Sequence, residues 1–387
     1  MLYYRYRPYN ELTLKELRYD EIYFSSKHES NDPYEGKVFL SYEFDKAKWE
    51  RFLKVAWYKS IEDQELLNSL STMLAEHLAN HCPITYEEAR NYSYFNVLLK
   101  KADPSLAYNL DLCIKKVIKL YRPKSRYTVS FSKKNDDVLL WSHYASKHKG
   151  FCLVFKAIDG FLYQDEKRII KSIHRTPPNG IGQSSSCDVP SKFNFRKINY
   201  VSQIEMLDAA RFLPGNVWDG LLADEDERLR FMDENESKTL EKHICWSYED
   251  EYRLVLNEPT PWLFGDHFDY SQEERLMHFQ PTQLVGIIFG ALMDQKLKDR
   301  IREIVYNRMI KIYMNCKGCA VFDFVIFEAA ISNTSREVKV TPIEIRGPNF
   351  SIFQTDVKFE LSYKYWEDGW AIPFDETGRG ASRKQFI

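Results

Sequence analysis

The sequence of 387 residues has no apolar run that could cross a bilayer, which takes about 18 residues or more. Its N-terminus starts Met1-Leu2-Tyr3-Tyr4-Arg5 and lacks the basic segment followed by an apolar segment that marks a secretory signal. Internal repeats and low-complexity tails are also absent. We therefore expect a cytoplasmic protein that is neither secreted nor embedded in a membrane.

Cysteine is scarce, and neither sign of charge dominates. The seven cysteines form an odd, scattered set, which is typical of free thiols in a reducing compartment. Only Cys316 and Cys319 are close, and no second ligand pair follows them, so a turn between strands is a simpler interpretation than a zinc site. The 54 Lys and Arg against 56 Asp and Glu give a net charge of -2, so no global positive field recruits nucleic acid or an acidic membrane.

Apolar residues are plentiful, at 44% of the chain with aromatics at 15%, which is enough to build a sizeable core. The order of strand-like and helix-like stretches predicts an α+β fold with a mixed or antiparallel sheet core. We expect one domain over residues 1–330, with a helical insert at about 46–121, and a β-rich appendage at 331–387. In the insert, Trp49, Phe52, Leu53 and Trp57 recur on one helical face.

Local patterns predict the individual elements. A short helix should run from Val138 to about His148, Asp224–His243 is charged and helix-forming, and Leu297–Met309 reads as an amphipathic helix. Residues 176–194 are rich in Pro, Gly and Ser and predict a long loop. Strands are expected at Leu2–Tyr6, Glu21–Ser25, Tyr127–Ser132, Phe151–Phe155, Tyr252–Leu256, Leu284–Gly290, Ile310–Met314 and Val338–Ile345.

The densest cluster of reactive and aromatic side chains lies in the tract Thr128–Phe155. It contains Trp141, His143 and Tyr144 on the expected short helix. His143 could move a proton or donate a hydrogen bond to a ligand. The alternative is that it packs beside the aromatic rings with a backbone hydrogen bond.

A second cluster, Trp246–Arg253, places Glu249, Asp250 and Glu251 where a strand begins. Strand alternation would send Glu249 and Glu251 to one face and Asp250 to the other. Two carboxylates on one face repel, which tends to raise the pKa of one of them, as a catalytic site requires. The alternative is a surface pair between Glu251 and Arg253.

A third cluster is N-terminal. Arg5 and Arg7 lie on one face of the first expected strand, and Arg suits bidentate binding of phosphate or carboxylate. Two arginines on a strand also form an ordinary solvated face. Both interpretations stay open on the residues alone.

These clusters, in this order, resemble a bacterial family of domains of unknown function, numbered 2971. The resemblance covers about residues 3 to 330. The matching motifs are Tyr4-Arg5-Tyr6-Arg7-Pro8, Ile22-Tyr23-Phe24-Ser25-Ser26, Asn31-Asp32-Pro33, Ser130-Phe131-Ser132, Leu140-Trp141-Ser142-His143-Tyr144-Ala145, Lys149-Gly150-Phe151-Cys152, Trp246-Ser247-Tyr248-Glu249, Glu251-Tyr252-Arg253-Leu254 and Ile287-Ile288-Phe289-Gly290.

The order of an Arg, a Ser-aromatic-Ser strand and a Glu-x-Glu pair is also similar to that of ADP-ribosyltransferases. The likeness implies NAD as substrate, Glu251 stabilising an oxocarbenium-like ribose and Glu249 orienting the acceptor. This sequence departs from the pattern in the long separation of Ser132 from Glu249 and in Phe131 at the middle position. The residues implied for NAD binding are Arg5, Arg7, Ser130, Ser132, Trp141 and Tyr144, with His143 as a further catalytic candidate.

Two other functions compete with NAD-dependent transfer or glycohydrolysis in a toxin or antiviral defence system. A metal-dependent nuclease or phosphoesterase would use Glu249, Asp250 and Glu251 with Asp32 or His143 as oxygen and nitrogen ligands. A non-catalytic protein would sense a nucleotide or a partner protein of a defence operon. The acceptor, whether protein or nucleic acid, is not specified by the sequence.

Overall fold

The computed structural model describes residues 1–32, 34, 39–120, 125–165, 169–175, 183–203, 205–212, 235–258, 269–315, 323–347 and 350–368. The predicted α+β class is confirmed, because helices cover a ten-stranded sheet whose strands are mostly antiparallel. Cys316 and Cys319 lie outside the described residues. None of the helices in the described ranges combines the length and hydrophobicity that crossing a membrane requires.

The main sheet runs in the order β12-β16-β6-β1-β7-β18-β19-β20-β21, with β3 beside β6. All neighbours pair antiparallel except β18 and β19. The chain's first strand therefore lies in the interior of the sheet. The bounds are β1 (Leu2–Arg7), β3 (Ser25–Ser26), β6 (Arg126–Ser132), β7 (Phe151–Lys156), β12 (Arg196–Lys197), β16 (Glu251–Asn257), β18 (Leu284–Phe289), β19 (Phe324–Ile331), β20 (Val338–Arg346) and β21 (Ser351–Phe353).

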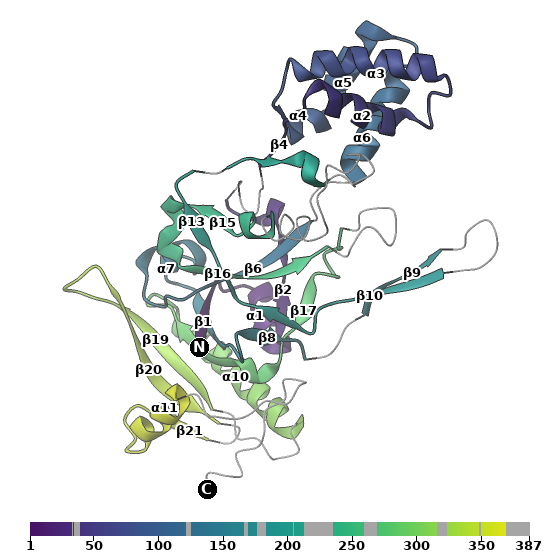
Figure 1. Cartoon of the computed structure of the whole chain (residues 1–387). Helices are drawn as coiled ribbons and strands as arrows, with labels where there is room; N and C mark the ends of the chain where they lie inside the picture. The colour runs from purple at the N-terminus through teal and green to yellow at the C-terminus, as the bar shows by residue number, and fades with distance from the viewer. Residues whose placement is uncertain are drawn as a thin grey trace.

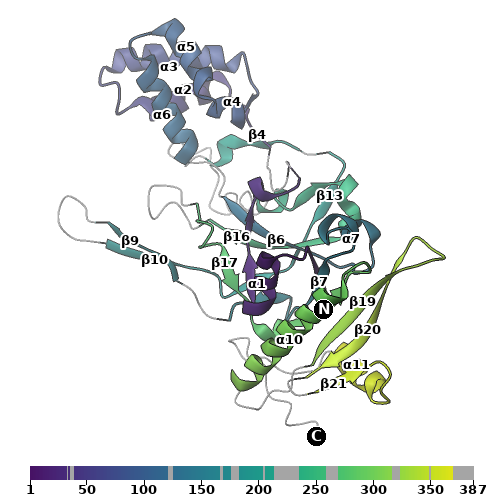
Figure 2. The same ribbon diagram turned by 180° about the vertical axis from the view of Figure 1, so that it is seen from behind.

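Helices pack on both faces of this sheet. On one face, α1 (Glu11–Tyr19) and α10 (Gln295–Asn315) lie side by side and bury their apolar residues against a core rich in Phe and Leu. On the other face, α7 (Val138–Tyr144) and α11 (Phe359–Glu367) bury Trp141 and Trp366 in a second core. Figure 2 shows α1 and α10 together in front of the strands.

A crossover through α10 connects the parallel strands β18 and β19. Every residue of β18 is buried, as its unbroken apolar run predicts for a strand covered on both faces. The prediction of a strand at Ile310–Met314 is wrong, because α10 continues to Asn315. Ile312 extends the buried helical stripe of Ile304, Val305 and Met309, so the helical period does not end at Met309.

The helical insert has its own core and lies to one end of the sheet in Figure 1. Its helices fall where the sequence predicts them and bury Trp49, Phe52, Leu53 and Trp57. A small three-stranded sheet, β14-β4-β5, joins this core. The bounds are β4 (Leu40–Tyr42), α2 (Lys46–Trp57), α3 (Gln64–Ala79), β5 (Ile84–Thr85), α4 (Tyr86–Arg90), α5 (Tyr92–Ala102), α6 (Ala107–Leu120) and β14 (Leu207–Asp208).

Three expectations need correction. The stretch 176–194 is not wholly loop, because β10 (Gln183–Asp188) pairs with β9 (Ile169–Arg175) and β11 (Lys192–Asn194) pairs with β8 (Phe161–Tyr163). Helix α7 ends at Tyr144, since Ser146, Lys147 and His148 all adopt positive φ, which a helix excludes. Strands β20 and β21 extend the main sheet, so residues 338–353 are continuous with it and not an appendage.

The remaining elements are short. Strand β2 (Glu21–Tyr23) pairs with β17 (Leu276–His278), and β13 (Asn199–Val201) pairs in parallel with β15 (Glu241–His243). The β13–β15 pair lies beside the sheet's β16 end in Figure 1 and brings β15 next to the start of β16. Four 3₁₀ turns complete the described residues: η1 (Lys27–Glu29), η2 (Ala209–Phe212), η3 (Ile244–Glu249) and η5 (Pro281–Gln283).

Candidate functional site

The pairing of β6 with β16 gathers the predicted serines and one glutamate on one face of the sheet. Ser132 lies directly opposite Glu251, and Ser130 lies opposite Arg253. Directly opposed residues project to the same side, so these four side chains share a face. Glu249 precedes the strand, at the end of η3, and Asp250 turns the chain in the left-handed region with φ of 40°. The two glutamates are therefore brought together by a turn rather than by strand alternation.

Lys242 of β15 holds both glutamates. Its Nζ donates to Glu249 Oε2 at 2.6 Å and to Glu251 Oε2 at 3.1 Å. Arg253 grips the same Glu251 carboxylate, with Nε at 2.6 Å from Oε1 and Nη2 at 3.0 Å from Oε2. All four residues are at most 5% exposed. We call Lys242, Glu249, Glu251 and Arg253 the carboxylate cluster.

The two carboxylates of the cluster differ in acidity. Burial would raise the pKa of Glu251, but the charges of Arg253 and Lys242 outweigh it and lower that pKa to about 2. Burial and the charge of Glu251 raise the pKa of Glu249, against the opposing pull of Lys242. Environments that push the pKa values of two neighbouring carboxyls apart are a feature of acid–base sites.

Tyr144 connects the cluster to the N-terminal loop. Its hydroxyl donates to Glu249 Oε1 at 2.5 Å and accepts from Asn31 Nδ2 at 3.0 Å. Burial and the hydrogen bond to Glu249 raise the pKa of Tyr144, so the phenol keeps its proton and donates. The predicted ligand-binding Tyr144 thus contacts a predicted catalytic residue directly. On the opposite side, the Tyr200 hydroxyl accepts from the backbone N–H of Glu251 at 2.9 Å.

The two predicted serines have different surroundings. Buried Ser132 donates from Oγ to the backbone oxygen of Glu249 at 2.6 Å and accepts from the N–H of Lys134 at 3.0 Å. It fixes the turn that carries Glu249. Ser130 is exposed, and its hydroxyl hydrogen bond to Glu251 contributes to the low pKa of that carboxyl.

Trp141 and His143 of α7 also differ in their surroundings. Trp141 is fully buried, donates from Nε1 to the backbone oxygen of Asn135 at 2.8 Å and packs edge-on against Tyr6. It belongs to the core, and no part of its ring is open to a ligand. His143 is exposed, and its ring centre lies 6.4 Å from that of Tyr248, which neighbours Glu249 in sequence.

Arg5 and Arg7 lie on the opposite face of the sheet from Glu251. Tyr4, not Arg5, is opposite Ser132, so alternation turns both arginines away from the serines and glutamates. Both form ion pairs with Glu16 of α1, at 3.5 Å for Arg5, and Arg5 also donates to the backbone oxygen of Ser130 at 3.2 Å. Burial lowers the pKa of Arg5 to about 10. The register of β1 thus separates the expected anion clamp from the carboxylates.

A cavity of about 540 Å³ adjoins the carboxylate cluster at Lys242. The Lys242 ammonium lies 4.7 Å from the centre of the Trp246 ring, within the cavity wall. Lys238, a second cation of the wall, is paired with Glu205 at 2.9 Å and Glu241 at 3.2 Å. The other lining residues are Asp32, Tyr34, Phe39, His243 and Cys245.

Sequence reasoning missed Lys242 and this cavity. Lys242 stands in the stretch Asp224–His243, which was predicted to be a charged helix. That prediction is wrong at its end, because Glu241–His243 form β15. Only the parallel pairing of β15 with β13 turns its side chain toward the glutamates. As for metal binding, no group of three His, Cys, Asp or Glu side chains in the described ranges could hold an ion.

Comparison with known proteins gives one match. No curated protein and no solved structure matches the chain. The segment 140–254 includes most of α7, all of β15 and the first four residues of β16, and with them every member of the carboxylate cluster. The resemblance expected from the sequence motifs is confirmed, since residues 140–254 match the model of a family described as a protein of unknown function, DUF2971.

Proposed function

We propose that the carboxylate cluster cleaves the N-glycosidic bond of a nucleotide bound in the adjoining cavity. NAD is the substrate, and ADP-ribose passes to water or to an acceptor. One observation carries the proposal: two buried carboxyls of opposite pKa shift share a lysine that also lines the cavity. In this proposal the main sheet is related to that of ADP-ribosyltransferases, and the protein acts in a bacterial toxin or defence system.

The chemistry divides between the two glutamates. Glu251, ionised at all ordinary pH values, stabilises the positive charge that develops on the ribose. The bond from C1′ to the pyridinium nitrogen breaks with its electron pair moving to nitrogen, which releases neutral nicotinamide. Water or an acceptor hydroxyl then adds to C1′ and gives its proton to ionised Glu249, whose raised pKa makes it the stronger base.

The cavity has the size of a nucleotide site, and its wall supplies aromatic rings and one cation of the carboxylate cluster. Its volume of about 540 Å³ falls among ordinary small-molecule sites. The rings of Trp246, Tyr34 and Phe39 can stack on a base, and Lys242 can pair with a diphosphate. Pairing with a phosphate would draw Lys242 from Glu249 and leave that carboxylate free to act as a base.

A second candidate is a protein that binds a nucleotide without turning it over. It is favoured by Glu251, which is 3% exposed and has both oxygens held by cations. It is also favoured by the position of Arg5 and Arg7 on the other face of the sheet. A metal-dependent nuclease has no comparable support from the described residues.

Incubation with NAD labelled separately in the nicotinamide and adenylate parts tests these functions. Transfer or glycohydrolysis predicts release of nicotinamide, unaffected by a chelator, with adenylate label in solution or on protein or added RNA. Glu251→Gln should lower kcat at least a hundredfold, and the rate should fall as the pH drops through the raised pKa of Glu249. Glu360→Gln, an exposed change on α11, is the matched control.

The outcomes separate the candidates. Turnover that Glu251→Gln leaves intact contradicts the assigned chemistry. NAD binding by calorimetry without any nicotinamide release favours the sensing function. Absence of both binding and release at millimolar NAD contradicts both candidates.

A further inference from the structure

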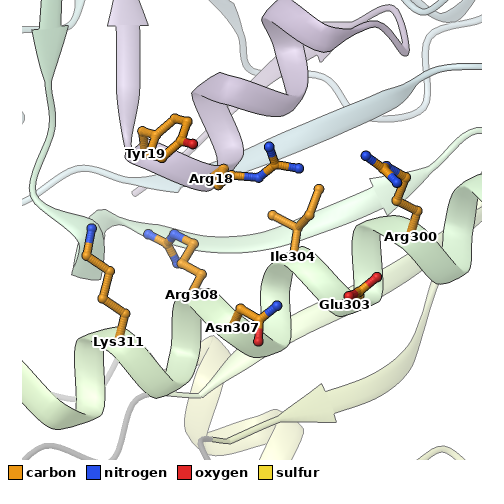
Figure 3. A pocket seen from close by; sticks show the side chains of 8 residues that line it. All are labelled: Arg18, Tyr19, Arg300, Glu303, Ile304, Asn307, Arg308 and Lys311. Atoms are coloured by element: carbon orange, nitrogen blue, oxygen red, sulfur yellow. The ribbon is translucent and has the colours of Figure 1, made fainter.

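A groove of about 320 Å³ lies between α1 and α10, on the opposite face of the sheet from the carboxylate cluster. Figure 3 shows Arg300, Arg308 and Lys311 rising from α10 toward α1, which contributes Arg18. Residues 300, 304, 308 and 311 follow the three- and four-residue spacing of one helical face. These cations and the neighbouring Glu303 form what we call the basic groove.

The charge of the basic groove is unbalanced. Four cations face a single carboxylate in its lining. Two other cations of α10 are paired, Lys298 with Glu328 and Arg302 with Asp299 and Glu344. Within the part of the chain that the structure describes, Arg18, Arg300 and Lys311 form no ion pair. The groove therefore has excess positive charge for a ligand to neutralise.

Arg308 shows where an anion would enter. It is 3% exposed, and its Nε donates to Asp20 Oδ1 at 2.7 Å while Nη2 donates to the backbone oxygen of Pro281. Its Nη1 is buried and has no hydrogen-bond partner among the described residues. A buried N–H of a charged group is costly to leave unpaired. Because Arg308 lines the groove, an acceptor oxygen placed there would satisfy it.

We infer that the basic groove binds a small molecule carrying two or more phosphates, such as a nucleoside triphosphate. Arg guanidinium groups match phosphate oxygens in a forked geometry, and Lys311 adds a point charge. The small volume favours the same ligand class.

This inference is independent of NAD cleavage, since the two sites use different elements and opposite faces. Arg300→Gln combined with Lys311→Gln should leave nicotinamide release unchanged. A failure of phosphate binding would accordingly leave the proposed function standing, and the reverse also holds.

Isothermal titration with tripolyphosphate and with ATP at low salt tests the inference on the full chain. We expect both probes to bind, and the Arg300→Gln/Lys311→Gln variant to weaken binding at least tenfold. Arg308→Lys, which keeps the charge but loses the fork, should also weaken it. Lys296→Gln removes one positive charge from α10 outside the groove and should have no effect.

Three results would overturn the inference. The first is absence of binding to both probes at low salt. The second is equal loss of affinity in Lys296→Gln and in the groove variant, which would indicate a general charge effect. The third is groove-dependent binding of a single-stranded oligonucleotide that tripolyphosphate fails to displace, which would assign the groove to nucleic acid.

Discussion

The carboxylate cluster and the basic groove are both built from ionisable side chains, yet they handle charge in opposite ways. In the cluster, two cations meet two carboxylates within hydrogen-bonding distance, and every member is buried. The groove lining holds four cations and one carboxylate; Arg308 pairs with Asp20 but keeps one buried nitrogen unpaired, and the other three cations form no ion pair among the described residues. The first set is balanced within the chain, whereas the second needs an external anion.

This difference tells which contacts a ligand must change. A ligand of the cluster has to displace an internal partner, so binding there is coupled to rearrangement of Lys242. A ligand of the groove meets Arg18, Arg300 and Lys311, which form no ion pair among the described residues. Balanced charges should therefore govern stability, and unbalanced charges should govern affinity.

The largest effect should come from removing the arginine of the cluster, which is the more deeply buried of its two cations. Arg253→Met leaves Glu251 with Lys242 alone and should lower the free energy of unfolding by about 3–5 kcal/mol. Urea denaturation followed by circular dichroism measures it, with Lys296→Gln as control. A loss below about 1 kcal/mol would mean that the cluster is not internally balanced.

Acid should weaken the cluster next. The folded pKa of Glu251 lies below its ordinary value of 4.5, so its stabilisation is complete above pH 4.5 and is lost as the pH falls toward about 2. We expect the free energy of unfolding to fall by about 3 kcal/mol as the pH drops through this window. The pKa of Glu249 is raised, so its contribution to stability changes with pH in the opposite direction. Urea denaturation of Glu249→Gln at several pH values therefore measures the contribution of Glu251 alone. The assignment of this acid-dependent loss to Glu251 is refuted if Glu251→Gln shows the same dependence of unfolding free energy on pH as the unsubstituted protein.

The two serines of β6 should contribute unequally to stability. Ser132→Ala removes the buried donor to the turn at Glu249 and should cost about 1–3 kcal/mol. Ser130→Ala, at an exposed position of the same strand, should cost less than about 0.5 kcal/mol. Thermal unfolding of the two variants side by side measures the difference, and similar costs would show that Ser132 does not support the turn.

The smallest effect on stability is expected in the groove. Arg300→Gln and Lys311→Gln should each leave the free energy of unfolding within about 0.5 kcal/mol, because no internal partner among the described residues is lost. Urea midpoints check this. A destabilisation of 2 kcal/mol or so would place these cations with the cluster, as structural charges.

Local pattern was enough to locate the strands that carry the site. Strands β6, β7, β16 and β18 are short runs of β-branched and aromatic residues bounded by polar turns, and each lies within a residue or two of its predicted range. The ion pair of Glu251 with Arg253, considered as a surface alternative, does form, but in the interior. Burial depends on which strand becomes the neighbour, and local pattern does not contain that information.

Pairing across long sequence distances accounts for what was missed. Arg5 and Arg7 were expected beside the glutamates, but the register of β1 against β6 puts Tyr4 on that face instead. Lys242 reaches the cluster through β15, and the groove joins α1 to α10 from the two ends of the chain. Strand alternation gives relative faces within one strand only, so such contacts require the assembled sheet.

The interior position of β1 also has a consequence for synthesis on the ribosome. This strand is made before its partners β6 and β7, which follow only after the whole helical insert. The insert has a core made mostly from its own helices and can collapse early through local contacts. We expect nascent β1 to keep its backbone donors and acceptors exposed until β6 and β7 have been made, so aggregation or chaperone capture is most favoured during this interval.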